Sequence, residues 1–92
     1  MLTSELYKYF KESNSVSTDT RLINTGTLFF ALKGNNFDGN KFAEQALENG
    51  ASYAVVDDHS LNNPKFIKVK NVLKSLQDLS KFHMEGFVGI FF

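Results

Sequence analysis

Residues 27–40 read TLFFALKGNNFDGN, an apolar run that passes directly into a loop rich in glycine and asparagine. Residues 27–32 lie between Gly26 and Gly34, and their length and composition predict a short buried strand. Residues 34–40 contain two glycines and three asparagines, which indicates a loop. Ligands of open α/β sheets bind beyond the carboxyl ends of the strands, so a binding site is expected at this junction.

Helical and extended patterns alternate on both sides of this stretch. Residues 2–12 carry apolar side chains at helical spacing, and a second helix is expected after the loop, with Asn40 as its N-cap and Asn49-Gly50 as its end. Residues 53–56 predict a short strand, residues 65–69 a half-exposed or edge strand, and residues 87–92 a further strand. A third helix is expected after Asn71, its cap. This order predicts an α/β fold with a small mixed or mostly parallel sheet flanked by helices.

The 92 residues suit one small domain, which we place at residues 1–84. Residues 85–92 are interpreted as the start of a junction to an absent ATP-binding domain. The apolar residues 87–92 would leave a strand edge unpaired, so we expect the isolated chain to self-associate through them.

Composition excludes several classes of function. The formal net charge is zero and the pI is about 6.7, so the basic face of a nucleic-acid-binding protein is not expected. No cysteine is present, which excludes disulfides and thiolate metal sites. No apolar stretch reaches the roughly 18 residues of a membrane span, and residues 1–10 lack the apolar run of a signal peptide. We expect a cytoplasmic protein without nucleic-acid or membrane partners.

Residues 17–21, STDTR, gather three hydroxyls, a carboxylate and a guanidinium. The hydroxyls of Thr18 and Thr20 could bond a base or a sugar, and Arg21 could pair with a phosphate. The alternative is a turn held together by an Asp19–Arg21 pair.

Residues 33–39, KGNNFDG, form the second candidate segment. Asn35 and Asn36 offer the donors and acceptors that a uracil edge requires, and Phe37 could stack on a base. The alternative is a plain connection from strand to helix, with glycines that serve the turn geometry.

Catalytic motifs are absent. The chain has no G-x-x-x-x-G-K-[ST] loop for ATP phosphates and no G-x-G-x-x-G. His59 and His83 are too few and too far apart for a zinc site. Asp57 and Asp58 could bind a cation at a strand end, but a solvated turn with a helix-capping role is the simpler interpretation. We expect no catalytic residue and no metal site in this chain.

Four motifs occur in one order: STDTR at 17–21, GTLFFALKG at 26–34, DGNKF at 38–42 and GA at 50–51. Together they resemble the N-terminal domain of Mur ligases of the MurE and MurF types, whose motifs are D-S-R, G-D-L-F-x-A-L-x-G, D-G-x-x-F and G-A-x-x-x-V. The resemblance covers residues 15–57 and, more loosely, extends to residue 83. The sequence at residues 29–34 and 39–42 favours the MurF type.

The resemblance implies a domain that binds the UDP end of a UDP-N-acetylmuramoyl peptide. The parent enzyme would be a peptidoglycan-precursor ligase that uses ATP and Mg²⁺ to add D-alanyl-D-alanine, with roles in cell-wall biogenesis, cell shape and cell division. Its partners would be the central and C-terminal domains of the same chain. Carried over by position, the UDP contacts fall on residues of the two candidate segments: Thr18, Thr20, Arg21, Asn35, Asn36 and Phe37. Asp38 and Gly39 take a structural role in the turn.

Several positions depart from the family pattern. Thr20 stands where serine is usual, Thr27 replaces an acidic residue, and Asn40 replaces a frequent histidine. Phe91-Phe92 stands where the chain should continue toward the ATP-binding loop. Two other interpretations stay open: a fragment of a MurE-type ligase, which adds the third amino acid of the peptide, and a non-catalytic α/β interaction module.

Overall fold

A computed structural model describes the backbone of residues 3–86 and the side chains of residues 3–81. The predicted strand at residues 87–92, the self-association assigned to it, and most of the predicted junction lie outside the described residues. Helices and strands follow one another in this order: α1 (Thr3–Glu12), β1 (Ser15–Ser17), the 3-10 turn η1 (Thr20–Leu22), β2 (Thr27–Phe30), the 3-10 turn η2 (Gly39–Phe42), α2 (Ala43–Glu48), β3 (Tyr53–Val56), β4 (Phe66–Lys68) and α3 (Val72–Gly86).

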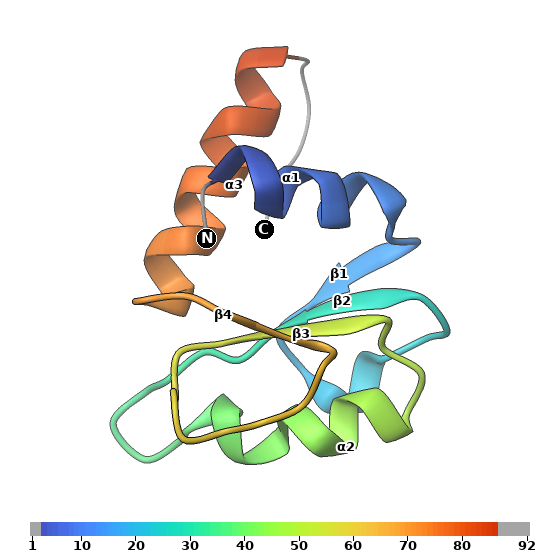
Figure 1. Ribbon diagram of the computed structural model, residues 1–92, viewed down its shortest axis with the longest axis vertical. Helices are drawn as coiled ribbons and strands as arrows, with labels where there is room; N and C mark the ends of the chain where they lie inside the picture. Colours follow the sequence, from blue (N-terminus) through green and yellow to red (C-terminus); the bar gives the residue numbers. More distant parts are fainter. Residues whose placement is uncertain (1–2, 87–92) are drawn as a thin grey trace.

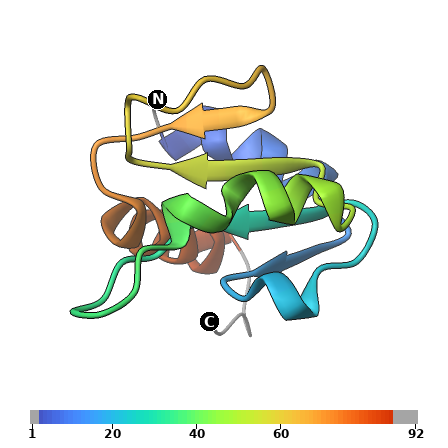
Figure 2. The same ribbon diagram turned by 90° about the horizontal axis from the view of Figure 1, so that it is seen from below.

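The strands form one parallel sheet in the order β1-β2-β3-β4. Helices α1 and α3 lie on one face of the sheet and α2 lies on the other, across β2 and β3 (Figures 1 and 2). This confirms the predicted α/β class, and the sheet is wholly parallel over the described residues. Strand β4 is an edge strand of this sheet, as its alternating sequence predicted.

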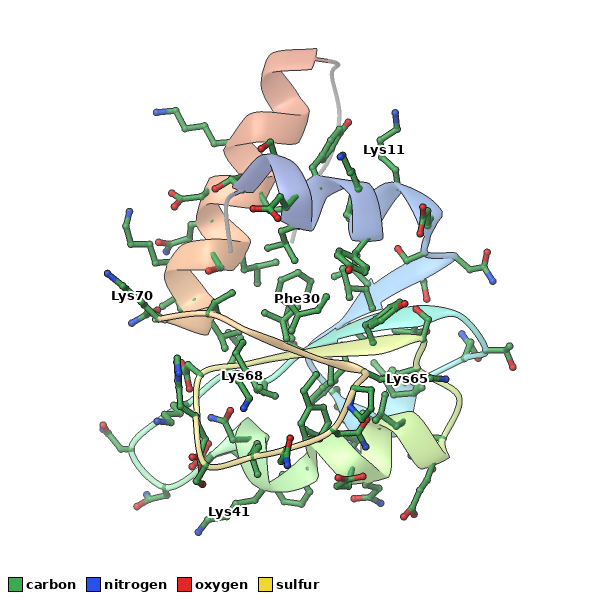
Figure 3. All side chains as sticks on the ribbon, viewed as in Figure 1. Lys11, Phe30, Lys41, Lys65, Lys68 and Lys70 are labelled. Carbon is green, nitrogen blue, oxygen red and sulfur yellow. The ribbon has the colours of Figure 1, made fainter. Side chains whose placement is uncertain are left out.

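Strand β2 is buried on both faces, which explains why its sequence is continuously apolar. Leu28 and Phe30 pack toward α1 and α3, whereas Phe29 packs toward α2. Figure 3 shows Phe30 in the layer between the sheet and the two helices, while Lys11, Lys41 and Lys70 project outward. Small alanines, Ala43 and Ala46, line the buried face of α2 and let this short helix lie close to the sheet.

Two local predictions are wrong. The strand expected at residues 27–32 ends at Phe30, because the backbone N–H of Leu32 turns back to the carbonyl oxygen of Phe30 at 3.1 Å. Asn40 is not a helix N-cap; Asp38 caps η2 by accepting a bond from the backbone N–H of Asn40 at 3.0 Å. The cap predicted at Asn71 is confirmed, since its Oδ1 accepts from the N–H of Lys74 at 2.9 Å.

Residue 84, the proposed end of the domain, falls inside α3, which continues to Gly86. The boundary itself stays a prediction.

Candidate functional site

A partly open cleft of about 550 Å³ lies on the α2 side of the sheet. One wall is the segment that leaves β1, with Thr18, Asp19, Thr20 and Arg21, and Phe29 of β2 also reaches it. The other wall comes from the loop after β2 and the turn into α2. Its side chains are Phe37, Phe42 and Gln45. Because the strands are parallel, the segments that follow β1 and β2 both leave the sheet at the carboxyl ends of the strands (Figure 2).

Local hydrogen bonds shape the first wall. The hydroxyl oxygen of Ser17 accepts from the N–H of Asp19 at 3.0 Å and donates to the carbonyl oxygen of Asp19 at 2.9 Å. Asp19 then caps η1 by accepting from the backbone N–H of Arg21 at 2.9 Å. The amide of Asn49 donates to the carbonyl oxygen of Thr20 at 3.1 Å and ties this wall to the end of α2. Small polar residues therefore build a defined turn here.

Asp19 and Arg21 form a bidentate ion pair in that turn. Nη2 of Arg21 lies 2.7 Å from Oδ2 of Asp19, and Nε lies 3.1 Å from Oδ1. Hydrogen bonding from the Arg21 side chain lowers the pKa of Asp19 to about 2, and the same pairing raises the pKa of Arg21. The pair is fully ionised at neutral pH, and it matches the interpretation in which Arg21 braces its own turn.

Two stacked aromatic rings form the second wall. The rings of Phe37 and Phe42 lie 5.5 Å apart between centroids and are inclined by 11°. Both are unusually exposed for phenylalanine, at 50% and 37%. The loop that carries Phe37 closes on itself, since the N–H of Gly34 donates to the carbonyl oxygen of Phe37 at 2.7 Å. An exposed, rigid aromatic surface of this kind suits the flat face of a base.

The turn between the loop and α2 requires glycine at position 39. The N–H of Gly39 donates to the carbonyl oxygen of Leu32 at 2.7 Å. A Cβ on Gly39 would lie 2.7 Å from the same oxygen and 2.9 Å from the carbonyl carbon of Ala31. The structural role proposed for Asp38 and Gly39 agrees with this geometry.

Asn40 connects that turn to the carboxyl end of β3. Its Nδ2 donates to Oδ1 of Asp38 at 2.8 Å and to Oδ1 of Asp57 at 2.9 Å. Its Oδ1 accepts from the backbone N–H groups of Asp57 at 3.0 Å and Asp58 at 3.2 Å. The side chain is 2% exposed, and these four bonds satisfy its donors and acceptors.

Asp57 links the same network to α3. Its Oδ2 accepts from the N–H of Val72 at 3.0 Å, and Nζ of Lys33 lies 3.6 Å from its Oδ1. Burial alone would raise the pKa of Asp57, but the bonds from Val72 and Asn40 and the charge of Lys33 outweigh it and lower the pKa. Asp57 therefore caps a helix, as the simpler interpretation of the Asp57-Asp58 pair proposed.

The cleft brings together four of the six proposed UDP contacts: Thr18, Thr20, Arg21 and Phe37. Asn35 and Asn36 are exposed residues of the same loop and are not among the residues that line the cleft. Phe42 and Gln45 also line the cleft, and neither is among the site residues predicted from the sequence.

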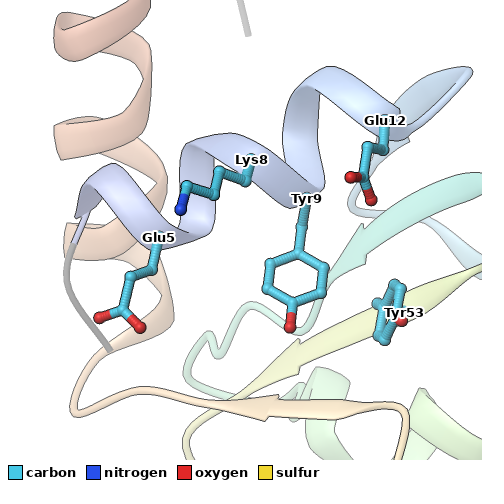
Figure 4. A pocket seen from close by; sticks show the side chains of 5 residues that line it. All are labelled: Glu5, Lys8, Tyr9, Glu12 and Tyr53. Carbon is cyan, nitrogen blue, oxygen red and sulfur yellow. The ribbon is translucent and has the colours of Figure 1, made fainter.

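A second hollow, of about 430 Å³, lies on the opposite face of the sheet (Figure 4). Glu5, Lys8, Tyr9 and Glu12 of α1 line it together with Tyr53 at the start of β3. The two tyrosine rings meet edge to face, with centroids 4.7 Å apart. None of the residues proposed to contact UDP lines this second hollow.

The sequence has no phosphate-binding loop. Among the side chains of residues 3–81, no three His, Asp or Glu residues are grouped so as to hold a metal ion. Over residues 3–86, no helix is long and apolar enough to cross a membrane.

Comparison with known families shows the class of protein. Residues 12–85 match the profile described as "Mur ligase family, catalytic domain". The chain belongs to the Mur ligase family, and it corresponds to the N-terminal domain of these proteins. This confirms the resemblance found in the four motifs.

Within the family, MurF and MurE proteins are both similar to this chain. It is 42% identical over 76 residues to UDP-N-acetylmuramoyl-tripeptide--D-alanyl-D-alanine ligase of Bacillus subtilis (strain 168), over 78% of the chain and 16% of the relative. It is 35% identical over 86 residues to UDP-N-acetylmuramoyl-L-alanyl-D-glutamate--2,6-diaminopimelate ligase of Clostridioides difficile (strain 630), over 83% of the chain and 18% of the relative.

The fold matches a solved MurF ligase. The crystal structure of the Thermotoga maritima enzyme in complex with ADP aligns with a TM-score of 0.74 and 26% identity, over 84% of this chain and 18% of that one. The chain thus spans 16–18% of the length of these relatives.

Proposed function

We propose that this chain is the UDP-N-acetylmuramoyl-peptide recognition domain of a MurF-type ligase. The parent enzyme would add D-alanyl-D-alanine to the peptide. The observation that carries the proposal is the cleft, because the two segments singled out in the sequence, at Thr18–Arg21 and Phe37, line the same hollow. Family membership and the similarity to MurF proteins support it.

The lining has the chemistry that a uridine group requires. The ring of Phe37 or Phe42 offers a stacking surface for the base. The hydroxyls of Thr18 and Thr20 and the amide of Gln45 offer donors and acceptors for the base edge and the ribose. In this proposal Asn35 and Asn36 approach the base from the rim of the cleft.

Binding at this cleft would contribute to a reaction elsewhere in the parent enzyme. A ligand held at its nucleotide end has its far end positioned for reaction, so remote binding energy lowers the barrier to chemistry. ATP and Mg²⁺ would be bound by other domains of the parent chain, since this sequence has no phosphate-binding loop.

A MurE-type parent is the second candidate. The 35% identity to the Clostridioides difficile ligase supports it. The two candidates share the proposed role of this cleft and differ in the peptide, so they are separated by testing the parent protein with UDP-N-acetylmuramoyl dipeptide and tripeptide.

Titration of the chain with UDP-N-acetylmuramoyl tripeptide, followed by amide chemical shifts, tests the proposal. We expect shifts at Thr18, Thr20, Phe37 and Gln45, and none around the hollow at Tyr53. Shifts confined to the Tyr53 side, or no saturable shift, would contradict the proposal.

A pair of variants sharpens the test. Phe37→Ala removes an exposed ring from the cleft, whereas Leu73→Ala removes a similarly exposed apolar side chain from α3, at 50% and 52% exposure. Loss of base stacking costs about 1–3 kcal/mol, so Phe37→Ala should weaken binding roughly 5- to 150-fold. Leu73→Ala should leave the affinity unchanged.

A further inference from the structure

The loop after β2 projects beyond the sheet (Figure 2), and it carries Phe37, one of the two stacked rings of the cleft. Its two limbs pair through an antiparallel bridge between Lys33 and Asp38, and the N–H of Gly34 donates to the carbonyl oxygen of Phe37 at 2.7 Å. Because these contacts join residues of the same loop, they fix its internal shape. The orientation of the loop relative to the sheet depends on contacts with other elements.

Both limbs of this loop are tied to Asp57 at the carboxyl end of β3. Nζ of Lys33 lies 3.6 Å from Oδ1 of Asp57, but 53% of the Lys33 side chain is exposed, so this ion pair is weak. Asp38, on the other limb, reaches Asp57 through the amide of Asn40, whose Nδ2 donates to the two carboxylates at 2.8 and 2.9 Å. Asp57 is itself held by the backbone N–H of Val72 at 3.0 Å. The buried part of the attachment is therefore the side chain of Asn40.

The amide of Asn40 also separates two like charges. Oδ1 of Asp38 and Oδ1 of Asp57 accept hydrogen bonds from the same nitrogen, which has one proton for each of them. An aliphatic side chain at position 40 would leave these two carboxylates near each other with no donor between them. Their repulsion would then drive the limb that carries Asp38 away from the end of β3.

A displacement of this limb would reach the cleft, because both rings are attached close to the amide. Phe37 directly precedes Asp38, and Phe42 lies in the same 3-10 turn as Asn40. The two rings are 5.5 Å apart between centroids and inclined by 11°. Asn40 is 2% exposed and is not among the residues that line the cleft, so it would act through the rings and not by contact with a ligand.

We infer that Asn40 is a positioning residue for the cleft. It holds the loop of residues 33–38 against the end of β3, so that Phe37 and Phe42 present one stacked surface. This inference rests on the proposed function. It assigns to one side chain an effect on the affinity of the cleft that is separate from its effect on the stability of the fold.

Asn40→Ala and Leu79→Ala form a matched pair for the test. Both remove buried contacts, but Leu79 belongs to the core on the α1 and α3 face of the sheet, away from the cleft. The two variants and the unmodified chain are titrated with UDP-N-acetylmuramoyl tripeptide at a temperature where circular dichroism shows all three to be folded. If Asn40→Ala does not fold, Asn40→Ser, which keeps a short donor and acceptor, takes its place under the same criteria.

The apparent dissociation constant rises as the binding-competent fraction of the protein falls. We therefore expect Asn40→Ala to bind at least about fivefold more weakly than the unmodified chain, and Leu79→Ala to bind within about twofold of it. An equal loss of affinity in both variants would mean that general destabilisation is the cause, and it would overturn the inference. An unchanged affinity in Asn40→Ala would overturn it as well.

A measurement without ligand separates this inference from the proposed function. Nuclear Overhauser cross-peaks between the ring protons of Phe37 and Phe42 report their stacking. We expect these cross-peaks in the unmodified chain and in Leu79→Ala, and their loss in Asn40→Ala. If they persist in Asn40→Ala, the inference is wrong while the proposed function stands. If they are lost as expected but the unmodified chain does not bind the tripeptide, the proposed function is wrong while the role of Asn40 in holding the loop is supported.

Discussion

Replacing Asn40 with alanine should be among the most damaging polar substitutions in this chain. The amide lies in a position that is 2% exposed and makes four hydrogen bonds of 2.8–3.2 Å. Through them, the turn before α2 is joined to the carboxyl end of β3. Because Asp57 also caps α3, the substitution loosens three elements at once.

The magnitude follows from the groups left without partners. In the variant, Asp38 still accepts a hydrogen bond from the backbone N–H at position 40. Asp57 still accepts from the N–H of Val72 and still pairs with Lys33. The backbone N–H groups of Asp57 and Asp58 lose their acceptor, at about 1–3 kcal/mol each for a buried group. Both residues are half-buried, so water compensates in part. We expect a loss of about 2–4 kcal/mol, and a fall in Tm of roughly 10–30 °C.

Urea unfolding followed by far-ultraviolet circular dichroism measures this loss. Asn49→Ala is the control, because its exposed side-chain amide donates to the carbonyl oxygen of Thr20 at 3.1 Å and the substitution should change stability by less than about 0.5 kcal/mol. A loss below about 1 kcal/mol for Asn40→Ala, or an equal loss for Asn49→Ala, would refute the reasoning.

Asn40→Asp tests how an added negative charge affects the stability of the same hydrogen-bond network. The variant keeps an acceptor for the N–H groups of Asp57 and Asp58 but places a third carboxylate beside Asp38 and Asp57. Like charges and burial raise the pKa of a carboxyl in the folded state, so this variant should regain stability relative to the unmodified chain as the pH falls. A pH-independent difference between the two proteins would contradict this.

Three further outcomes are expected. Gly39→Ala should cost about 1–3 kcal/mol, because its Cβ would meet the backbone of Leu32 at 2.7 Å, whereas Gly34→Ala meets nothing within 4 Å and should be nearly neutral; thermal melts of both check this. The pKa of Asp57 is lowered from its usual 3.8, so the stability contributed by its ionised carboxylate is complete above pH 3.8 and is lost as the pH falls through the folded-state pKa. Urea midpoints between about pH 2 and pH 6 should show this loss in the unmodified chain and not in Asp57→Asn. Leu79→Ala should cost about 2–5 kcal/mol in urea unfolding, because that side chain is fully buried against the sheet, and a loss below about 1 kcal/mol would place it outside the core.

The local sequence was sufficient to predict a helix, strand or cap wherever the residues of that element alone decide its structure. The apolar run at 27–30 specifies a strand buried on both faces, and Gly50 ends α2 with a φ of 117°, a conformation that favours glycine. Asn71 caps α3 because its Oδ1 bonds an N–H three residues away. Such contacts lie within one turn of chain, so periodicity and capping rules predict them.

Contacts between distant segments were not predictable in this way. The sequence suggested a local helix cap for Asn40, whereas its side chain bonds Asp57, which lies seventeen positions along the chain. Local patterns do not reveal a partner at that separation. No local pattern indicates that the ring of Phe42 stacks on Phe37 in the cleft.

The sequence by itself determined the α/β class and the family and singled out the two polar segments of the proposed site, but it predicted no strand at Ser15–Ser17. Only the tertiary structure decided that Thr18, Thr20 and Phe37 share one cleft with Gln45, and that Asn35 and Asn36 stay at its edge. The physical reason is that local propensities act over a few residues, whereas the pairing of β1 with β2 as parallel neighbours decides which loops meet.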